Sequence, residues 1–430
     1  MQEKNRPEDK SEGAGNQAAR KATLPPGGGA GKPAARKATL PPGSGPAGPP
    51  TRKPTLPPGT GVRAATPQGK PVAAKLPPGA RKSESGGPVV LPVLETKPTG
   101  PTRADYTSDQ DVRWCPGCGD YAVLATVQRL MPEIDVPREN VVFISGIGCS
   151  SRFPYYMNTY GMHSIHGRAP SIATGLKASR PELDVWIVTG DGDSLSIGGN
   201  HLIHLMRRNV NLQIMMFNNQ IYGLTKGQYS PTSELGKITK STPFGSIDHP
   251  FNPAALVLGA EGSFVARTMD RDPKHMKEIL RSAHDHAGTG FVEIYQNCNI
   301  FNDGAFFRYT EKDTKDHQGV FMEHGKPLVY AGGTRGLRLD GFRIEAIDLT
   351  NERWSADDCL IHDETSRELA GILSRVFWSE SLPQPFGIFY REERQTYEQQ
   401  LQNQIQAVID RVGAGTIEEL LHAGDTWTVQ

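Results

Sequence analysis

A carboxylate and an amide side chain follow two strand-like runs at a spacing that suits the binding of a cation. Asp191 comes directly after the apolar run VWIVTG, and Asn218 and Asn219 end the next such run. Parallel strands joined through one helix end side by side at the same edge of a sheet. Mg²⁺ takes oxygen ligands in octahedral geometry, so protein groups would supply about three and a bound diphosphate most of the rest. Gly190 and Gly192 let the backbone approach those phosphates.

Four cysteines offer a second kind of chemistry. Cys115 and Cys118 flank a Pro-Gly pair ahead of an apolar stretch, whereas Cys149 follows one predicted strand and Cys298 ends another. The CPGC pair alone fits zinc, an iron–sulfur cluster, a redox disulfide or no chemistry. Zinc sites with four cysteines usually consist of two paired knuckles, but here one pair accompanies two remote single thiols. A [4Fe–4S] cluster accepts such scattered ligands and is favoured over structural zinc and inert thiols.

The elements that must position these residues alternate between strands and helices. Val- and Ile-rich runs predict buried strands, and helical patterns lie between them. The predicted strands cover 139–148, 183–193, 209–220 and 290–298, and the predicted helices cover 121–131, 170–180, 198–208 and 273–286. This alternation is typical of an α/β fold, a doubly wound parallel sheet with helices on both faces and its ligand site at the carboxyl edge.

The first part of the chain has a different composition. Residues 1–104 are rich in Pro and Gly and repeat a TLPPG motif, so we expect a disordered, partly polyproline II tether. As an alternative function, Thr23, Thr39 and Thr55 follow basic residues and could be phosphorylated to dock a partner.

Two further segments complete the predicted organisation. Residues 105–319 form the predicted cofactor-binding domain, and residues 320–430 form a C-terminal extension. The extension contains predicted strands over 336–349 and a polar helix over 391–412. A polar helix of this kind is typically solvated or faces another subunit.

Composition excludes several classes of protein. The formal net charge is zero, but the first 100 residues hold 16 Lys and Arg against 6 Asp and Glu, so the rest is acidic. An acidic folded part argues against nucleic-acid binding. Five cysteines do not indicate a secreted disulfide framework, and no apolar run reaches the roughly 18 residues of a membrane span. The N-terminus lacks a signal-peptide core. We therefore expect a cytoplasmic protein that binds no membrane.

The residues around both sites resemble those of one enzyme family. GDGD with NN 27 and 28 residues later is the thiamine diphosphate motif, and NNQIYGLTKGQYSPTS resembles the β subunits of 2-oxoacid:ferredoxin oxidoreductases. So do WCPGCGDY, SGIGCSSRFPYY, HGRAPSIATG and YQNCNIFNDGAF. The resemblance runs from about residue 105 to at least 310 and is strongest to the 2-oxoglutarate branch. It implies the thiamine-diphosphate-binding fold of the diphosphate-binding type.

The resemblance also implies cofactor and metal contacts. It makes Cys115, Cys118, Cys149 and Cys298 the ligands of a [4Fe–4S] cluster, and Asp191, Asn219 and the carbonyl of Ile221 the ligands of Mg²⁺. The residues that it implies to contact thiamine diphosphate are Ile147, Gly148, Cys149, Ser150, His166, Gly167, Arg168, Ala169, Gly192, Asp193, Gly223 and Leu224. For His166 the alternative is a loop histidine held by the backbone.

Three residues are candidates for catalysis or substrate recognition. Arg152 could form a bidentate pair with the distal carboxylate of 2-oxoglutarate. Lys226 could bind the substrate carboxylate or a coenzyme A phosphate, and His166 belongs to the same predicted set. An ordinary surface or interface role is the alternative for Arg152 and Lys226. Cys359 matches no motif, and we expect a partly buried thiol without a chemical role.

The implied reaction is the thiamine-dependent oxidative decarboxylation of a 2-oxoacid, 2-oxoglutarate above all. Coenzyme A takes the acyl group, CO₂ leaves, and the electrons pass through the cluster to a ferredoxin. The family places the glutamate that activates thiamine on a separate α subunit, so we expect a heterodimer or heterotetramer whose β chain alone is inactive. The alternatives are a pyruvate or broad 2-oxoacid substrate, a non-oxidative thiamine-dependent decarboxylase or synthase component, and a zinc-stabilised scaffold.

Overall fold

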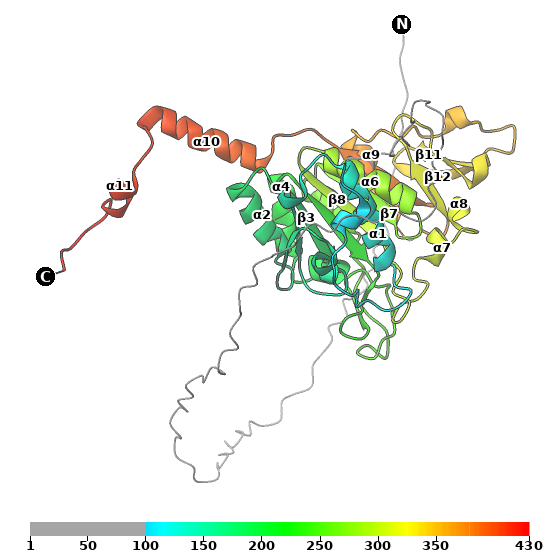
Figure 1. Cartoon of the computed structure of the whole chain (residues 1–430). Coiled ribbons are helices and arrows are strands. Elements are labelled where there is room, and N and C mark those ends of the chain that lie inside the picture. The colour runs from blue at the N-terminus through cyan, green and yellow to red at the C-terminus, as the bar shows by residue number, and fades with distance from the viewer. Residues whose placement is uncertain (1–99, 378, 430) are drawn as a thin grey trace, which may run out of the picture. The chain divides into compact units, whose positions relative to one another are not determined.

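The computed structural model describes residues 100–377 and 379–429 as one folded unit (Figure 1). The TLPPG repeats and their threonines lie outside the described residues. The unit is built on an eight-stranded sheet with the strand order β2-β1-β3-β4-β8-β7-β13-β9. In that order the strands are Tyr160–His163, Val141–Ser145, Asp184–Gly190, Leu212–Asn218, Thr289–Tyr295, Phe264–Met269, Gln384–Arg391 and Gly319–Met322.

Most of this sheet is parallel. The first six strands in the spatial order, β2 to β7, pair in parallel, whereas β13 runs antiparallel to β7 and pairs in parallel with β9. The doubly wound parallel sheet expected from the sequence is thereby confirmed. Strands β9 and β13 come from the segment predicted as a C-terminal extension, and they complete the main sheet.

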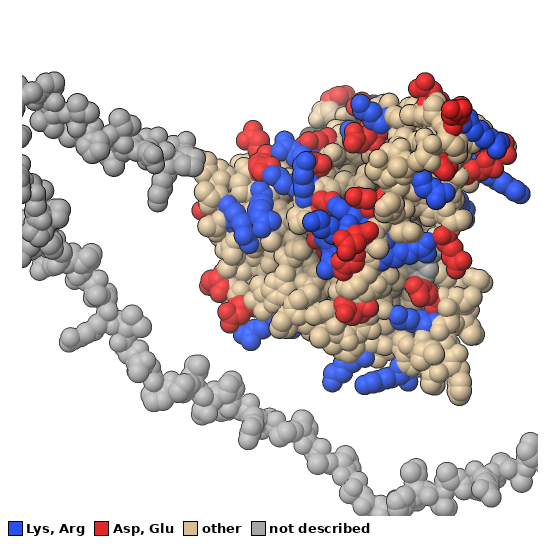
Figure 2. Space-filling view, turned by 90° about the vertical axis from the view of Figure 1, so that its right-hand side faces the viewer, with Lys and Arg blue, Asp and Glu red and all other residues tan. Residues whose placement is uncertain are grey.

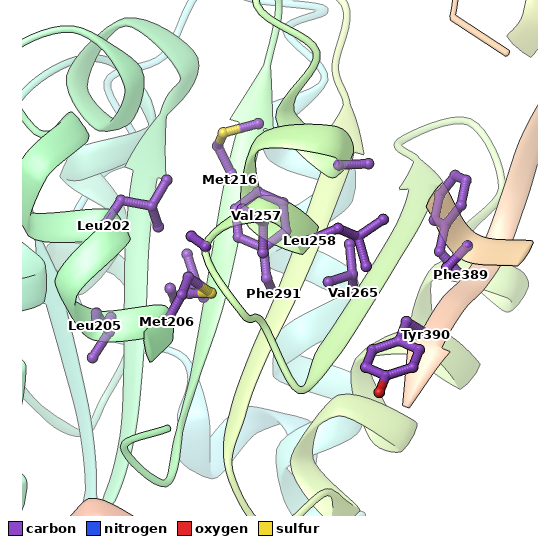
Figure 3. Close-up of a cluster of buried hydrophobic side chains, with 14 of the residues drawn as sticks. Leu202, Leu205, Met206, Met216, Val257, Leu258, Val265, Phe291, Phe389 and Tyr390 are labelled. Carbon is purple, nitrogen blue, oxygen red and sulfur yellow. The ribbon is translucent and has the colours of Figure 1, made fainter. Parts of the chain in front are cut away.

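Helices cover both faces of the sheet. Successive side chains of a strand point to opposite faces, so Trp186 packs in one core and its neighbour Ile187 in the other. The helices of the first face are α1 (Asp120–Leu130) and α6 (Pro273–Asp285), and those of the second are α2 (Ala169–Ser179), α4 (Gly199–Arg208), α5 (Pro253–Gly259) and α9 (Arg367–Ser374). Figure 3 shows part of the second core, where Met206 of α4 and Val257 of α5 lie near Phe291 of β8.

The part of the chain after residue 305 adds smaller elements. The strands predicted over 336–349 are β11 (Arg335–Asp340) and β12 (Arg343–Asp348), which form an antiparallel sheet with β10 (Val329–Tyr330). The helix predicted over 391–412 begins later, as α10 (Tyr397–Val412), because residues up to Arg391 belong to β13. Three short helices are also present in this part of the chain, α7 (Phe307–Thr310), α8 (Lys315–Gln318) and α11 (Ile417–Leu421).

The surface mixes both signs of charge. Figure 2 shows basic and acidic side chains interspersed over one face of the folded unit, without an extended basic area on that face. Within residues 100–377 and 379–429, no helix is both long enough and apolar enough to cross a lipid bilayer.

Candidate active site

The carboxyl ends of β3 and β4 lie side by side and carry the predicted metal ligands. Gly190 and Phe217 are paired in the register of the two strands. Asp191 then begins the short helix α3 (Asp191–Leu195), and Asn219 leads into the hairpin of β5 (Ile221–Tyr222) and β6 (Gln228–Tyr229). Asp191 and Asn219 line one pocket, as the parallel topology predicts.

This pocket collects most of the predicted cofactor contacts. Its lining includes Ile147, Gly148, Cys149, Ser150, His166, Gly192, Asp193, Gly223 and Leu224, together with Asp191, Asn219 and Ile221. Gly167, Arg168 and Ala169 are not in the lining and lie at the start of α2. Gly190, Tyr222 and Thr225 also line the pocket, and sequence patterns did not identify Tyr222 or Thr225 as contacts.

Asp191 is a buried carboxylate held by two hydroxyl groups. Ser230 Oγ and Thr232 Oγ1 each donate a hydrogen bond of 2.5 Å to its Oδ2. Burial raises the pKa of Asp191 to about 6, despite the lowering effect of these hydroxyl donors. A bound cation would offset the cost of keeping this buried group ionised, so its surroundings fit a metal ligand.

The two asparagines after β4 have different roles. Asn218 donates from Nδ2 to the buried carboxylate of Glu293 at 2.7 Å, so its side chain supports the sheet. Asn219 donates from Nδ2 to Gln296 Oε1 at 2.8 Å, which leaves Oδ1 as its accepting atom. The Ile221 amide also donates to this Oδ1, at 3.2 Å. The structure therefore identifies Asn219, rather than Asn218, as the asparagine at the pocket.

Asp193 joins the loops that form the pocket wall. Its Oδ1 accepts hydrogen bonds from the amides of Ile147 (3.1 Å) and Gly167 (2.8 Å) and from His166 Nδ1 (3.0 Å), and its Oδ2 accepts from Thr189 Oγ1 (2.8 Å). Because a carboxylate only accepts, Nδ1 of His166 carries the proton of this hydrogen bond. His166 is thus held by a side chain and not by the backbone.

Two glycines shape the backbone of the pocket in different ways. A Cβ atom at Gly192 would lie 2.2 Å from Cε1 of Tyr222, whose hydroxyl donates to the Gly192 carbonyl at 3.1 Å. Gly148 has a φ of +130°, and a Cβ atom there would meet nothing within 4 Å. The backbone at Gly148 therefore borders open space in the pocket, as a site for a diphosphate requires.

The four predicted cluster ligands converge beside this pocket. A Cβ atom at Gly223, which lines the pocket, would lie 3.5 Å from Cys298 Sγ and 3.7 Å from Cys149 Sγ. The backbone amide of Cys118 donates a hydrogen bond of 3.1 Å to the Cys115 carbonyl in the turn before α1. Besides burial and Asp120, the nearby Cys298 and Cys149 help to raise the pKa of Cys118. Cys298 and Cys115 likewise help to raise the pKa of Cys149. One neighbourhood therefore contains thiols from three chain segments.

Two of these thiols, those of Cys118 and Cys149, are poorly suited to being ionised without a metal. Burial, and then the nearby Asp120 carboxylate, raises the pKa of Cys118 strongly and that of Cys149 to about 12. Iron cations would reverse this effect by stabilising the thiolates. Within the described residues no three His, Cys, Asp or Glu side chains lie close enough together to hold a single metal ion.

Comparisons with known proteins identify the family. Residues 146–294 match the family described as thiamine pyrophosphate enzyme, C-terminal TPP binding domain. The chain is 52% identical over 330 residues to the 2-oxoglutarate oxidoreductase subunit KorB of Mycobacterium tuberculosis, which covers 76% of this chain and 88% of the relative. It is 34% identical over 309 residues to the 2-oxoacid:ferredoxin oxidoreductase subunit beta of Saccharolobus solfataricus, over 71% of this chain and 90% of the relative. The chain belongs to the β subunits of the 2-oxoacid:ferredoxin oxidoreductases.

A solved structure supports the assignment of this β subunit. The 2-oxoglutarate:ferredoxin oxidoreductase from Magnetococcus marinus, with 2-oxoglutarate, coenzyme A and succinyl-CoA bound, is similar with a TM-score of 0.60 and 31% identity. The similarity covers 77% of this chain and 98% of that chain. The chain is therefore an oxidoreductase subunit and, as a β subunit, one part of a multi-subunit enzyme.

The two basic residues predicted to recognise substrate lie outside the pocket lining of the β subunit. Arg152 is half-buried in the 3-10 turn Ser150–Tyr156, close enough to Cys149 for its charge to lower that thiol's pKa. Lys226 is exposed in the β5–β6 turn, with a φ of +76°. Cys359 is buried against β11, where a Cβ atom at Gly336 would lie 2.2 Å from its sulfur.

Proposed function

We propose that this β subunit binds thiamine diphosphate with Mg²⁺ and a [4Fe–4S] cluster, and that it takes part in the oxidative decarboxylation of 2-oxoglutarate to succinyl-CoA and CO₂. The observation that carries this proposal is that Gly223 lines the pocket and also lies beside the sulfurs of Cys149 and Cys298. The substrate is supported by the relative named a 2-oxoglutarate oxidoreductase and by the solved structure with 2-oxoglutarate bound.

Different residues of the pocket would bind Mg²⁺ and the diphosphate of the thiamine cofactor. Asp191, Asn219 and the Ile221 carbonyl would hold Mg²⁺, and the backbone at Gly148 and Gly192 would approach the diphosphate. Thiamine diphosphate, when bound, supplies the carbanion that adds to the 2-oxoacid carbonyl and accepts the electrons left by decarboxylation. The residues of this chain bind and orient, through the carboxylate of Asp191 and the loops that Asp193 joins.

The cysteines would hold the group that carries electrons away. Cys115, Cys118, Cys149 and Cys298 would be its four thiolate ligands. The cluster, when bound, supplies one-electron transfer toward a ferredoxin. The oxidation of the 2-oxoacid releases two electrons, and a one-electron carrier removes them one at a time.

An α subunit would complete the site. We expect it to supply the pyrimidine-side domain and the activating glutamate, in a cytoplasmic heterodimer or heterotetramer. Exposed apolar side chains support a protein contact here, because the segment after β6 presents Phe244 fully exposed and Ile247 89% exposed. Burying such residues against a partner would stabilise the assembly.

Anaerobic purification with and without the α subunit tests the proposed function. The complex should contain four irons per β subunit, and its broad visible absorption should bleach when 2-oxoglutarate and coenzyme A are added. The single β chain should reduce neither ferredoxin nor viologen. Robust reduction by the β chain alone would contradict the need for an α subunit. Release of an aldehyde without electron transfer would favour a non-oxidative decarboxylase, and zinc in place of iron would overturn the cluster.

Arg152→Ala in the complex is expected to change substrate preference. If Arg152 pairs with the distal carboxylate, kcat/KM for 2-oxoglutarate should fall by about 10²-fold, as for loss of a charge-assisted bidentate pair. The value for 2-oxobutyrate, which lacks that carboxylate, should change less than about threefold. Steady-state ferredoxin reduction with both acids measures this, with the exposed Arg113→Ala as control. Equal losses on both substrates would remove Arg152 from substrate recognition.

A further inference from the structure

Gln296 lies between the thiols and the predicted magnesium ligands. It directly follows β8, and its side chain is buried, with 1% of the residue exposed. Its Nε2 donates to Cys118 Sγ at 3.3 Å and to the Asn297 carbonyl at 2.7 Å. Its Oε1 accepts from Asn219 Nδ2 at 2.8 Å. A single planar amide therefore contacts one residue of each predicted metal site.

The neighbours of Gln296 allow only this orientation of the amide. Turning it over would bring Nε2 against Asn219 Nδ2, which is also a donor, and Oε1 against the Asn297 carbonyl, which is also an acceptor. The backbone is fixed as well, because the Gln296 amide donates to the Asn218 carbonyl at 2.9 Å. The Asn297 amide donates to Asp270 Oδ2 at 2.8 Å. The N–H group that faces Cys118 is thus held in place from several sides.

We propose that Gln296 is a positioning residue that favours the reduced form of the cluster and orients Asn219 toward Mg²⁺; this rests on the proposed function. Reduction adds negative charge that is partly carried by the cysteine sulfurs, so an N–H donor to Cys118 stabilises the reduced state more than the oxidised state. Burial strengthens this bond because no water replaces it. At the other end, the bond to Asn219 Nδ2 fixes that side chain as a support for a metal ligand.

Gln296→Met in the complete enzyme tests both parts of the proposal. Methionine has a similar size but no donor or acceptor of comparable strength. We expect the equilibrium constant for one-electron reduction of the cluster to fall about tenfold, which is a potential about 59 mV lower. The Mg²⁺ concentration that half-saturates thiamine diphosphate binding should rise about tenfold. Redox titration followed by electron paramagnetic resonance measures the first quantity, and calorimetric titration the second.

Gln213→Met is the matched control. Gln213 is also a buried glutamine, in β4, and its Nε2 makes a long bond of 3.5 Å to the Ala283 carbonyl. If Gln296 acted only through packing, the two variants would behave alike. The proposal requires that the cluster potential and the Mg²⁺ requirement change in Gln296→Met alone. Should that variant fail to assemble, Gln296→Asn keeps an amide that is too short to reach Cys118 and should lower the potential in the same direction.

The outcomes separate this proposal from the proposed function. A wild-type complex without iron would remove the cluster and with it the basis of the inference. Four irons and an unchanged potential in Gln296→Met would overturn the role toward the cluster while leaving the cluster itself in place. An unchanged Mg²⁺ requirement would overturn the role toward Asn219.

Discussion

Replacing Asp191 by alanine in the complex with the α subunit is expected to abolish saturable binding of Mg²⁺ and thiamine diphosphate. Ferredoxin reduction should fall by at least about 10³-fold, which is about 4 kcal/mol of lost stabilisation. The reason is that Asp191 is the one charged group among the three predicted magnesium ligands, and it lies in a buried pocket where its charge is poorly screened. Calorimetric titration measures binding, and the exposed Asp285→Ala is the control.

The Asp191→Asn variant separates loss of charge from loss of structure. An amide oxygen still accepts from Ser230 and Thr232, so the loop after β6 stays in place. Burial raises the pKa of Asp191 to about 6, above its unfolded value of about 3.9. The folded state therefore binds more protons, and the metal-free protein loses stability as the pH rises from about 4 to about 6. At pH 8, Asp191→Asn should raise the melting temperature of the metal-free protein while removing the further rise caused by Mg²⁺ and thiamine diphosphate. A lower melting temperature without metal, or retained stabilisation by Mg²⁺, would contradict the predicted role.

Replacing Cys298 by serine is expected to remove the cluster but retain the thiamine site. Cys298 follows β8 and does not line the pocket, whereas Cys149 lines the pocket and is also a predicted cluster ligand. Loss of one thiolate should eliminate the visible absorption and lower ferredoxin reduction by about 10³-fold or more, because the path for single electrons is interrupted. Binding of Mg²⁺ and thiamine diphosphate should change less than about threefold. Iron analysis, visible spectra and calorimetry measure these three quantities.

Cys359→Ser provides the matched control for this experiment. Cys359 is buried against β11, away from the predicted ligand set, and it should be replaceable without loss of iron or of activity. A Cys298→Ser variant with a full iron content would remove Cys298 from the ligand set. Loss of iron in Cys359→Ser instead would show that stability of the fold, and not ligation, controls the iron content.

Sequence patterns predicted the strands that are mostly apolar and missed β7, whose central arginine is paired only in the folded protein. The runs at β1, β3, β4 and β8 are rich in Val, Ile, Phe and Met, as strands buried on both faces require. Strand β7 has the sequence FVARTM. An arginine such as Arg267 is not expected in a buried core unless an acidic partner neutralises its charge. In the structure Arg267 Nε donates to Glu293 Oε2 of β8 at 2.8 Å, and both residues are completely buried.

The C-terminal strands show a second limit of sequence patterns. Nothing in the local sequence of β9 or β13 indicates that they join the main sheet, because their partners are far away in the chain. Strand β13 pairs with β7, more than 100 residues earlier. The expected extension after residue 320 therefore contributes two strands to the same sheet.

At the site, the sequence by itself predicted the types of ligand and determined which strand ends meet, whereas the tertiary structure decided the supporting contacts. Asp191 and Asn219 could be placed together from their positions after two parallel strands, since topology brings such ends to one edge. The hydrogen bonds from two hydroxyl groups to Asp191, and the one from the Gln296 amide to Cys118, could not be predicted. They join residues that are 39, 41 and 178 positions apart in the chain. Ligand types follow from local motifs, but the groups that orient and tune them meet only when distant segments pack.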